Sequence, residues 1–127
     1  MTGAPVFTIS KEFAFSASHI LAGLPEGHQC GRLHGHNYVV VIELAGTEVD
    51  DRGFVMDYGD LSPLKSFVDD VLDHRHLNDL APFAGDRNPT AENLAAWIYA
   101  KATVEWQWPV SGVGISETPK TWAWYRG

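Results

Sequence analysis

The apolar residues of this chain change their spacing twice, and that change constrains the fold more than any other feature of the sequence. Over residues 6–15 the apolar side chains fall on one parity, which predicts a half-buried strand. Residues 37–45 are dense in β-branched and aromatic side chains and predict a second strand. The period becomes helical over residues 61–72 and returns to that of strands over residues 110–125.

Two helices are predicted in the middle of the chain. Apolar residues over 61–72 recur at spacings of three and one, with Asp60 as the expected N-cap and Pro63 in the first turn, where proline is tolerated. Thr90 is the expected cap of a second helix, which runs to the low hundreds. Residues 73–89 are expected to form the loop between the helices.

Strand pairing is predicted at both ends of the helical region. Residues 54–57 are expected to return beside residues 37–45 as the short arm of a hairpin. Residues 110–117 and 121–125 predict two closing strands, separated by a turn at Pro119.

This order of elements predicts one α+β domain over residues 1–127, with a four-stranded antiparallel sheet and both helices on one of its faces. The other face of the sheet and its two edges are then uncovered in a single chain. Because unpaired edges template association, and because five tryptophans occur in so short a chain, we expect oligomers.

Composition excludes several classes of protein. We expect neither membrane insertion nor export, because the sequence has no apolar run of bilayer length and no basic region followed by an apolar segment at its start. A single cysteine makes no intrachain disulfide, so a cytoplasmic protein is expected. A net charge of −7 with scattered Lys and Arg argues against nucleic-acid binding.

Three histidines form the first candidate site. His34 and His36 lie two residues apart at the start of a predicted strand, so both imidazoles project from one face. His19 follows the first predicted strand and is expected alongside them. Three imidazoles with one open position suit a catalytic zinc ion. Taken alone, a His-x-His pair more often only decorates a strand surface.

Further candidates follow from position in the chain. Cys30 stands four residues before His34, where nearby positive charge would favour its reactive thiolate, although a lone cysteine is more often a small buried apolar group. Asp73 and His74 are an adjacent acid and imidazole that could relay protons, or interact with a helix C-terminus. Glu117 ends a predicted strand and could accept two N–H groups of an amidine-like edge, or be a solvated strand end.

These residues, in this order, resemble the 6-pyruvoyltetrahydropterin synthase family over essentially the whole chain. Within the family, the chain is more similar in its short length and in residues 25–28 to bacterial 6-carboxytetrahydropterin synthases than to the eukaryotic pyruvoyl-forming enzymes. The segments that carry the resemblance are Phe15-Ser16-Ala17-Ser18-His19, Cys30-x-x-x-His34-Gly35-His36, Val55-Met56-Asp57-Tyr58, Leu72-Asp73-His74-x-x-Leu77-Asn78, Asn88-Pro89-Thr90-x-Glu92-Asn93 and Glu117-Thr118.

The resemblance implies the tunnelling fold, in which trimers join their sheets into a barrel and two trimers stack as a homohexamer with active sites between subunits. It implies 7,8-dihydroneopterin triphosphate as the substrate and Zn²⁺ as the cofactor. The roles that it implies are zinc binding by His19, His34 and His36, catalysis by Cys30, Asp73 and His74, and substrate binding by Glu117 and Thr90.

The expected reaction gives 6-carboxy-5,6,7,8-tetrahydropterin, acetaldehyde and triphosphate, in the synthesis of queuosine or another 7-deazapurine. Two alternatives stay open: elimination of triphosphate to give 6-pyruvoyltetrahydropterin, and a non-catalytic pterin-binding homologue. The triphosphate needs cations, for which the candidates are Lys11, Arg32, Arg75, Lys120 and Arg126.

Overall fold

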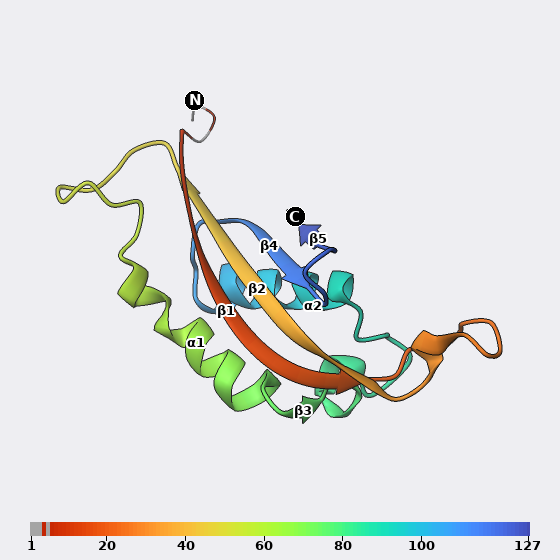
Figure 1. Cartoon of the computed structure of the whole chain (residues 1–127). Helices are drawn as coiled ribbons and strands as arrows, with labels where there is room; N and C mark the ends of the chain where they lie inside the picture. Colours follow the sequence, from red (N-terminus) through yellow and green to blue (C-terminus); the bar gives the residue numbers. More distant parts are fainter. Residues whose placement is uncertain (1–3, 5) are drawn as a thin grey trace.

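The computed structural model describes residue 4 and residues 6–127. Two strands of thirteen residues, β1 (Phe7–His19) and β2 (His34–Gly46), curve across the molecule as an antiparallel pair (Figure 1). They stay in register along their whole length, from Phe7 opposite Gly46 to His19 opposite His34. Because this pairing is unbroken, alternate residues of both strands keep to the same face of the sheet as far as the histidines at its end.

The sheet has five strands in the order β3-β1-β2-β4-β5. β4 (Val110–Ser116) pairs antiparallel with β2, and β5 (Ala123–Tyr125) pairs antiparallel with β4. β3 (Arg75–His76) runs parallel to β1 on the outer edge. The prediction of four antiparallel strands was therefore incomplete, because β3 lies inside the expected loop 73–89 and two residues are too short to show a period.

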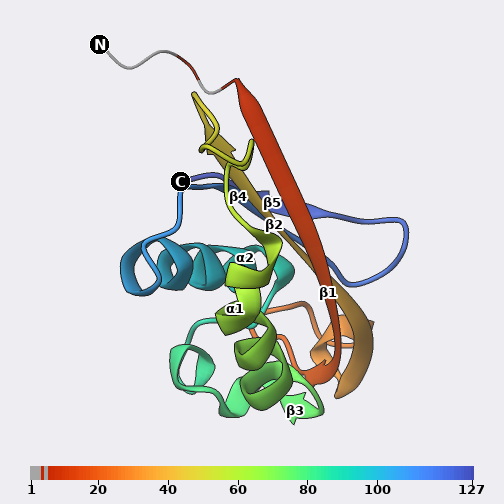
Figure 2. The same cartoon turned by 90° about the vertical axis from the view of Figure 1, so that its left-hand side faces the viewer.

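Both helices cover the same face of the sheet, as predicted (Figure 2). α1 (Ser62–Phe67) begins with Pro63 in its first turn and continues into a π-helical turn, Val68–Leu72. α2 (Ala91–Ala100) is capped by Thr90, whose hydroxyl accepts the N–H of Asn93, and continues into a second π-helical turn, Lys101–Glu105. Thr90 was predicted correctly as the cap.

The core fills the space between this face and the helices. Tyr38, Val40, Ile42 and Leu44 of β2 are fully buried, and Phe15 and Ala17 of β1 share their face. The remaining buried apolar residues come mainly from β4 and the helical segments: Leu61, Leu64, Phe67, Val68, Leu72, Leu77, Phe83, Leu94, Ala95, Ile98, Ala102, Val113 and Ile115.

Two local predictions were wrong. Residues 54–57 form no strand beside β2, because both edges of β2 are already occupied by β1 and β4. Asp57, not Asp60, caps the following 3₁₀ turn (Tyr58–Leu61), with its carboxylate accepting the Gly59 N–H at 2.8 Å. Within the described part of the chain, no helix has the length and apolar character needed to cross a membrane.

Candidate functional site

Three histidines meet at one end of the sheet, on the face that the helices cover. His19 is the last residue of β1 and lies directly opposite His34, the first residue of β2. His36 lies opposite Ala17 and shares the parity of the buried residues of β2. One ligand atom from each of the three residues falls within 4.8 Å of the other two. The predicted convergence of these imidazoles is confirmed.

Two backbone carbonyls fix the tautomers of His19 and His34. His19 Nδ1 lies 2.8 Å from the carbonyl oxygen of Pro89, and His34 Nδ1 lies 2.6 Å from that of Arg32. A carbonyl oxygen only accepts hydrogen bonds, so each Nδ1 must carry the proton. The two Nε2 atoms, 2.9 Å apart, therefore face each other with their lone pairs. That contact is repulsive unless a cation or a proton lies between them.

His36 supplies a third nitrogen, which makes no hydrogen bond. Among residue 4 and residues 6–127, its Nε2 is the one buried side-chain nitrogen or oxygen atom that makes no hydrogen bond. The carboxylate of Glu117 approaches it at 3.2 Å, at an angle that makes no hydrogen bond. Buried polar atoms are almost always paired, so this one indicates a missing positive partner. Three nitrogen donors converging in this way fit a metal ion with an open position.

The electrostatics of His19 favour the neutral form, which binds metals. Burial lowers the pKa of His19, and the neighbouring His34 and His36 lower it further. The hydrogen bond to Pro89 and the charge of Glu117 act in the opposite direction and do not overcome the effect of burial.

Tyr38 packs against two of the three imidazoles, those of His19 and His36, and it was not predicted from the sequence. Its ring stacks on Phe15 with centroids 4.8 Å apart, and it meets the rings of His19 and His36 edge-on. Its hydroxyl lies 3.3 Å from His19 Nδ1. Burial raises the pKa of Tyr38 above its ordinary value, so the phenol stays neutral. Its position two residues after His36, on the same parity, was the available signal.

Cys30 lies in a short 3₁₀ turn, Gln29–Gly31, and is half-buried. Its N–H donates to His28 Nδ1 at 3.1 Å, and its carbonyl oxygen accepts the N–H of Leu21 at 3.2 Å. The thiol is therefore carried by a turn that is attached to the chain just beyond His19. His28, which had no predicted role, caps this turn.

Asp73 and His74 lie on the outer edge of β1, where both bind Ser16. The π-helical turn ends at Asp73, whose carboxylate accepts the Ser16 N–H at 2.9 Å. The His74 N–H donates to the Ser16 carbonyl at 2.6 Å, with His74 in the left-handed region at φ 58°. The His74 side chain is 83% exposed, and its Nε2 lies 3.7 Å from the Asp73 carboxylate. The predicted acid and imidazole are thus adjacent, and the imidazole faces solvent.

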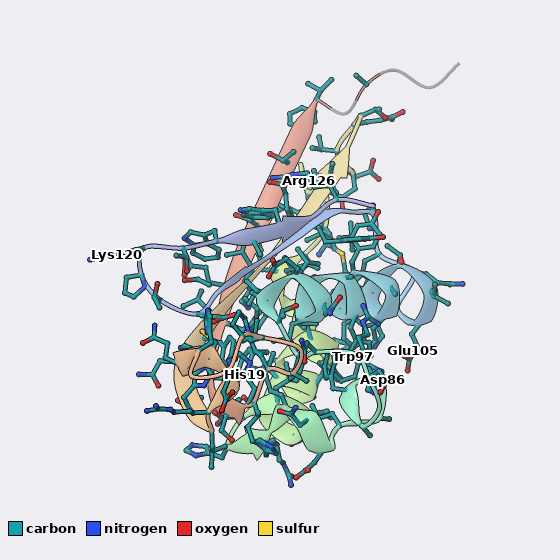
Figure 3. All side chains as sticks on the ribbon, turned by 90° about the vertical axis from the view of Figure 1, so that its right-hand side faces the viewer. His19, Asp86, Trp97, Glu105, Lys120 and Arg126 are labelled. Atoms are coloured by element: carbon teal, nitrogen blue, oxygen red, sulfur yellow. The ribbon has the colours of Figure 1, made fainter. Side chains whose placement is uncertain are left out.

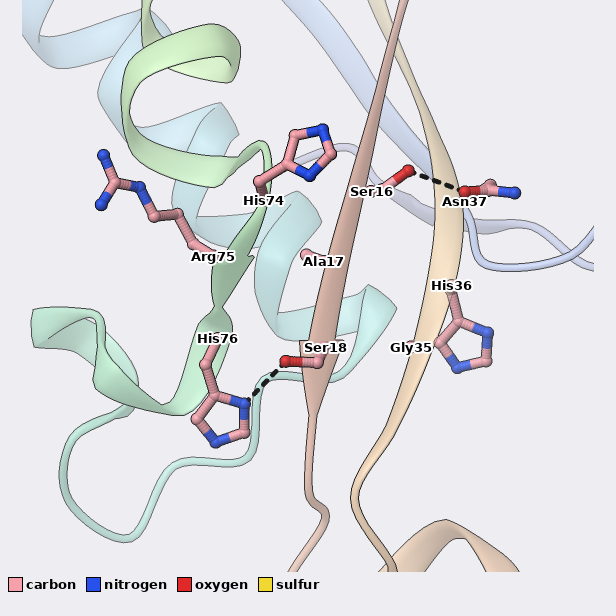
Figure 4. A pocket seen from close by; sticks show the side chains of 9 residues that line it. All are labelled: Ser16, Ala17, Ser18, Gly35, His36, Asn37, His74, Arg75 and His76. Carbon is pink, nitrogen blue, oxygen red and sulfur yellow. Dashed lines mark hydrogen bonds between the residues drawn. The ribbon is translucent and has the colours of Figure 1, made fainter.

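An open hollow of about 450 Å³ is lined by residues 16–18 of β1, residues 35–37 of β2 and residues 74–76 (Figure 4). Its polar lining includes an imidazole–hydroxyl pair, His76 Nδ1 with Ser18 Oγ at 2.9 Å. His36 and His74 both line it, whereas Cys30 does not. No hydrogen bond or ion pair in the described part of the chain joins Cys30 to Asp73 or His74. One chain therefore does not bring the three predicted catalytic residues into direct contact.

The two predicted substrate-binding residues, Glu117 and Thr90, lie at different places in the structure. Glu117 follows β4 directly, and its half-buried carboxylate lies beside His36, so it belongs to the histidine cluster. The hydroxyl of Thr90 is engaged in capping α2, and the preceding residue, Pro89, orients His19.

The candidate cations are dispersed. Arg126 pairs with Glu43 at 2.7 Å, and both Arg126 and Lys120 lie well away from His19 (Figure 3). Arg75 donates to the Asp70 carbonyl at 3.2 Å and points away from the two long strands (Figure 4).

Comparison with known proteins gives matches along nearly the whole chain. The profile of a family described as 6-pyruvoyl tetrahydropterin synthase matches residues 8–127, a range that includes every site residue above. The chain is 36% identical to the 6-carboxy-5,6,7,8-tetrahydropterin synthase of Bacillus subtilis, over 94% of this chain and 85% of that protein. It is 41% identical to the Synechocystis protein of the same name, over 76% and 74% respectively. The solved structure of Caenorhabditis elegans 6-pyruvoyl tetrahydropterin synthase matches with a TM-score of 0.82 at 33% identity, covering 100% of this chain and 99% of that one.

Proposed function

Because this chain belongs to the 6-pyruvoyl tetrahydropterin synthase family, whose members are lyases that act on pterin triphosphates, we propose that it converts 7,8-dihydroneopterin triphosphate to 6-carboxy-5,6,7,8-tetrahydropterin. One molecule of water is consumed, acetaldehyde and triphosphate are the other products, and the pathway is the synthesis of queuosine or another 7-deazapurine. The observation that carries the proposal is the histidine cluster, in which the buried His36 Nε2 makes no hydrogen bond, in a chain whose relatives in several bacteria bear the carboxytetrahydropterin synthase name.

His19, His34 and His36 would hold the metal ion, and zinc is the ion that three neutral imidazoles and an open position suit best. When bound, zinc supplies Lewis acidity toward the hydroxyl oxygens of the substrate side chain, which acidifies the neighbouring carbon-bound proton. The carbonyls of Pro89 and Arg32 orient two of the ligands. Such hydrogen bonds raise ligand basicity and fix the ring orientation.

Cys30 would remove the carbon-bound proton, and Asp73 with His74 would move protons at the side chain. These residues lie apart within one chain, so we propose that a neighbouring subunit brings them together in a homohexamer built from two trimers. The two sheet edges, β3 and β5, and the exposed Trp122 and Trp124 supply surface for such contacts. The exposure of His74 is consistent with a role across an interface.

Glu117 would bind the pterin ring, because one carboxylate accepts both the amino group and the ring N–H of a pterin edge. Its place beside His36 supports this role, since a ring held there would present its side chain to the metal. Thr90 remains a predicted substrate contact, and its bond to Asn93 gives it a structural role as well. We expect the assembled enzyme in the cytoplasm.

The test is product analysis with 7,8-dihydroneopterin triphosphate and zinc-loaded protein, with a Cys30→Ala variant as the control. We expect equal amounts of acetaldehyde and 6-carboxytetrahydropterin, and no product from the variant. A pyruvoyl product without acetaldehyde would assign the second candidate function, which the similarity to the Caenorhabditis elegans enzyme favours. Pterin binding without triphosphate release above the control would make the protein a non-catalytic homologue.

A further inference from the structure

Residues 20–22 follow β1 and lie outside the sheet, yet their backbone groups make hydrogen bonds on both sides of the segment. On one side the partners are two asparagine side chains. Asn78 accepts the Ile20 N–H and donates to the Ile20 carbonyl, both at 2.9 Å. Asn88 does the same for Ala22, at 2.8 and 2.9 Å. Each amide therefore replaces one residue of a neighbouring strand, and no other orientation of the amide satisfies both bonds. We call these hydrogen bonds of Asn78 with Ile20 and of Asn88 with Ala22 the clamp.

The two asparagines continue an edge that β3 begins. β3 pairs parallel with β1 up to Ser18 opposite His76, and Asn78 follows two residues after His76. Ile20 and Ala22 are two residues apart, so they present their N–H and carbonyl groups to the same side. The main-chain ladder of β3 thus passes into a ladder made by side chains.

On the opposite side, the same segment holds the turn that carries the thiol. Leu21, between the two clamped residues, donates its N–H to the carbonyl oxygen of Cys30 at 3.2 Å. This hydrogen bond couples the position of residues 20–22 to that of the Cys30 backbone.

The clamp is also connected to the metal ligands. His19 immediately precedes Ile20, and its Nδ1 bonds the carbonyl of Pro89, the residue after Asn88. Asn93 donates to the Asn88 carbonyl at 2.8 Å and ties this loop to the first turn of α2. One network of hydrogen bonds therefore sets both the imidazole of His19 and the turn of Cys30.

We propose that Asn78 and Asn88 are positioning residues, which set the place of the Cys30 thiol relative to the histidine cluster. This inference rests on the proposed function, in which Cys30 acts at the metal-bound substrate. A thiol that removes a proton must lie within hydrogen-bond reach of it, and misplacement by about 1 Å can cost about a hundredfold in rate. An amide that only stabilised the fold would not affect this distance.

The test uses Asn78→Asp and Asn88→Asp, made separately. Each keeps the size and the acceptor oxygen but turns a second oxygen toward the backbone carbonyl. Ile42→Val, which removes one buried methyl group far along β2, is the control for a loss of stability alone. Because Cys30 is the only cysteine, its alkylation by iodoacetamide reports on this thiol specifically.

For both asparagine variants we expect unchanged zinc content, KM within about threefold of the parent and kcat lower by at least about tenfold. The alkylation rate of Cys30 should change by more than about threefold at fixed pH, because the environment of the thiol changes. The proposal is overturned if kcat and the alkylation rate match those of Ile42→Val.

The two proposals fail in different ways. If the parent protein does not act on the pterin triphosphate, the proposed function fails, while the alkylation rates of the zinc-loaded variants still decide whether the asparagines position Cys30. If Asn78→Asp or Asn88→Asp does not fold, Asn78→Ser or Asn88→Ser is tested in its place. Serine brings no carboxylate against the backbone carbonyl.

Discussion

At the scale of single residues, the protonation of His19 decides whether the cluster binds a metal. Its imidazole is fully buried, and its Nδ1 proton is committed to Pro89. Nε2 therefore points to His34 as a bare lone pair, ready for a cation. A buried imidazole in this state has a consequence for stability as well as for binding.

We expect the metal-free protein to lose stability as the pH falls below about 6.5. Burial lowers the pKa of folded His19 from its ordinary value, so below that value the unfolded chain binds more protons than the folded one. Above it, His19 is neutral in both states and contributes no pH dependence. Urea unfolding of chelator-treated protein between pH 7.5 and 5.5 measures the effect, above the range in which carboxylates titrate.

His19→Gln should flatten this profile, because it removes the buried imidazole. An equal slope in the parent and in His19→Gln would show that His19 is not the group responsible.

Glu117 separates recognition of the ring from chemistry on the side chain. Glu117→Gln keeps the shape but replaces one acceptor oxygen by a donor, so we expect pterin binding to weaken by at least about tenfold with zinc content unchanged. Fluorescence titration with a dihydropterin gives the affinity. Glu105→Gln removes the same charge from an exposed pair with Lys101 and should bind like the parent. Unchanged binding by Glu117→Gln would make it only a solvated strand end.

The placing of His34 and His36 on one face could be predicted from the sequence because it depends on strand parity alone. His19 joins them through the register of β1 with β2, in which it lies opposite His34. The sequence placed His34 and His36 on one face, and the structure agrees. What orients them could not be predicted. The carbonyl that fixes His19 belongs to Pro89, seventy residues away, and the clamp on Ile20 comes from Asn78, fifty-eight residues away. Such contacts follow from the path of loops, which have no period.

At the scale of elements, one π-helical turn and the short edge strand β3 place two of the catalytic candidates, Asp73 and His74. The turn Val68–Leu72 ends with the Asp73 N–H on the Val68 carbonyl at 2.8 Å, and this delivers Asp73 and His74 to the edge of β1. π-helical turns are rare and occur often at functional sites. The extra residue in this turn was not visible in the apolar spacing, which is the same as that of an α-helix.

The pairing of β4 with β5 depends on a glycine. Gly114 lies opposite Trp124, and a Cβ atom at Gly114 would lie 2.7 Å from the indole ring. Gly114→Ala should therefore displace Trp124 and lower the free energy of unfolding by about 1–3 kcal/mol. Gly85→Ala, where an added Cβ meets no neighbour, should be nearly neutral. Chemical denaturation compares the two, and equal stabilities would contradict the close packing of Trp124 on β4.

At the scale of the whole molecule, the layering could be predicted from the sequence, whereas the oligomer expected from the uncovered edges stays a prediction. Periods of two and 3.6 residues along the chain suffice to predict an α+β domain with helices on one face. The hairpin predicted for residues 54–57 was wrong because a strand has only two edges, and those of β2 are occupied by the preceding strand β1 and by the distant strand β4. Which edges of one chain meet another is likewise a property of surfaces, and the proposed hexamer rests on family likeness and on exposed residues such as Trp122.

We propose that His19, His34 and His36 form a metal centre on which the reaction with the pterin triphosphate depends. The most direct test is triphosphate release by the purified protein before chelation, after chelation and after reloading with zinc, with metal content measured on the same samples. We expect one zinc per chain, loss of release on chelation, and recovery on reloading in the parent but not in His36→Gln. Equal release by the metal-free protein, or by His36→Gln without bound zinc, would contradict the account.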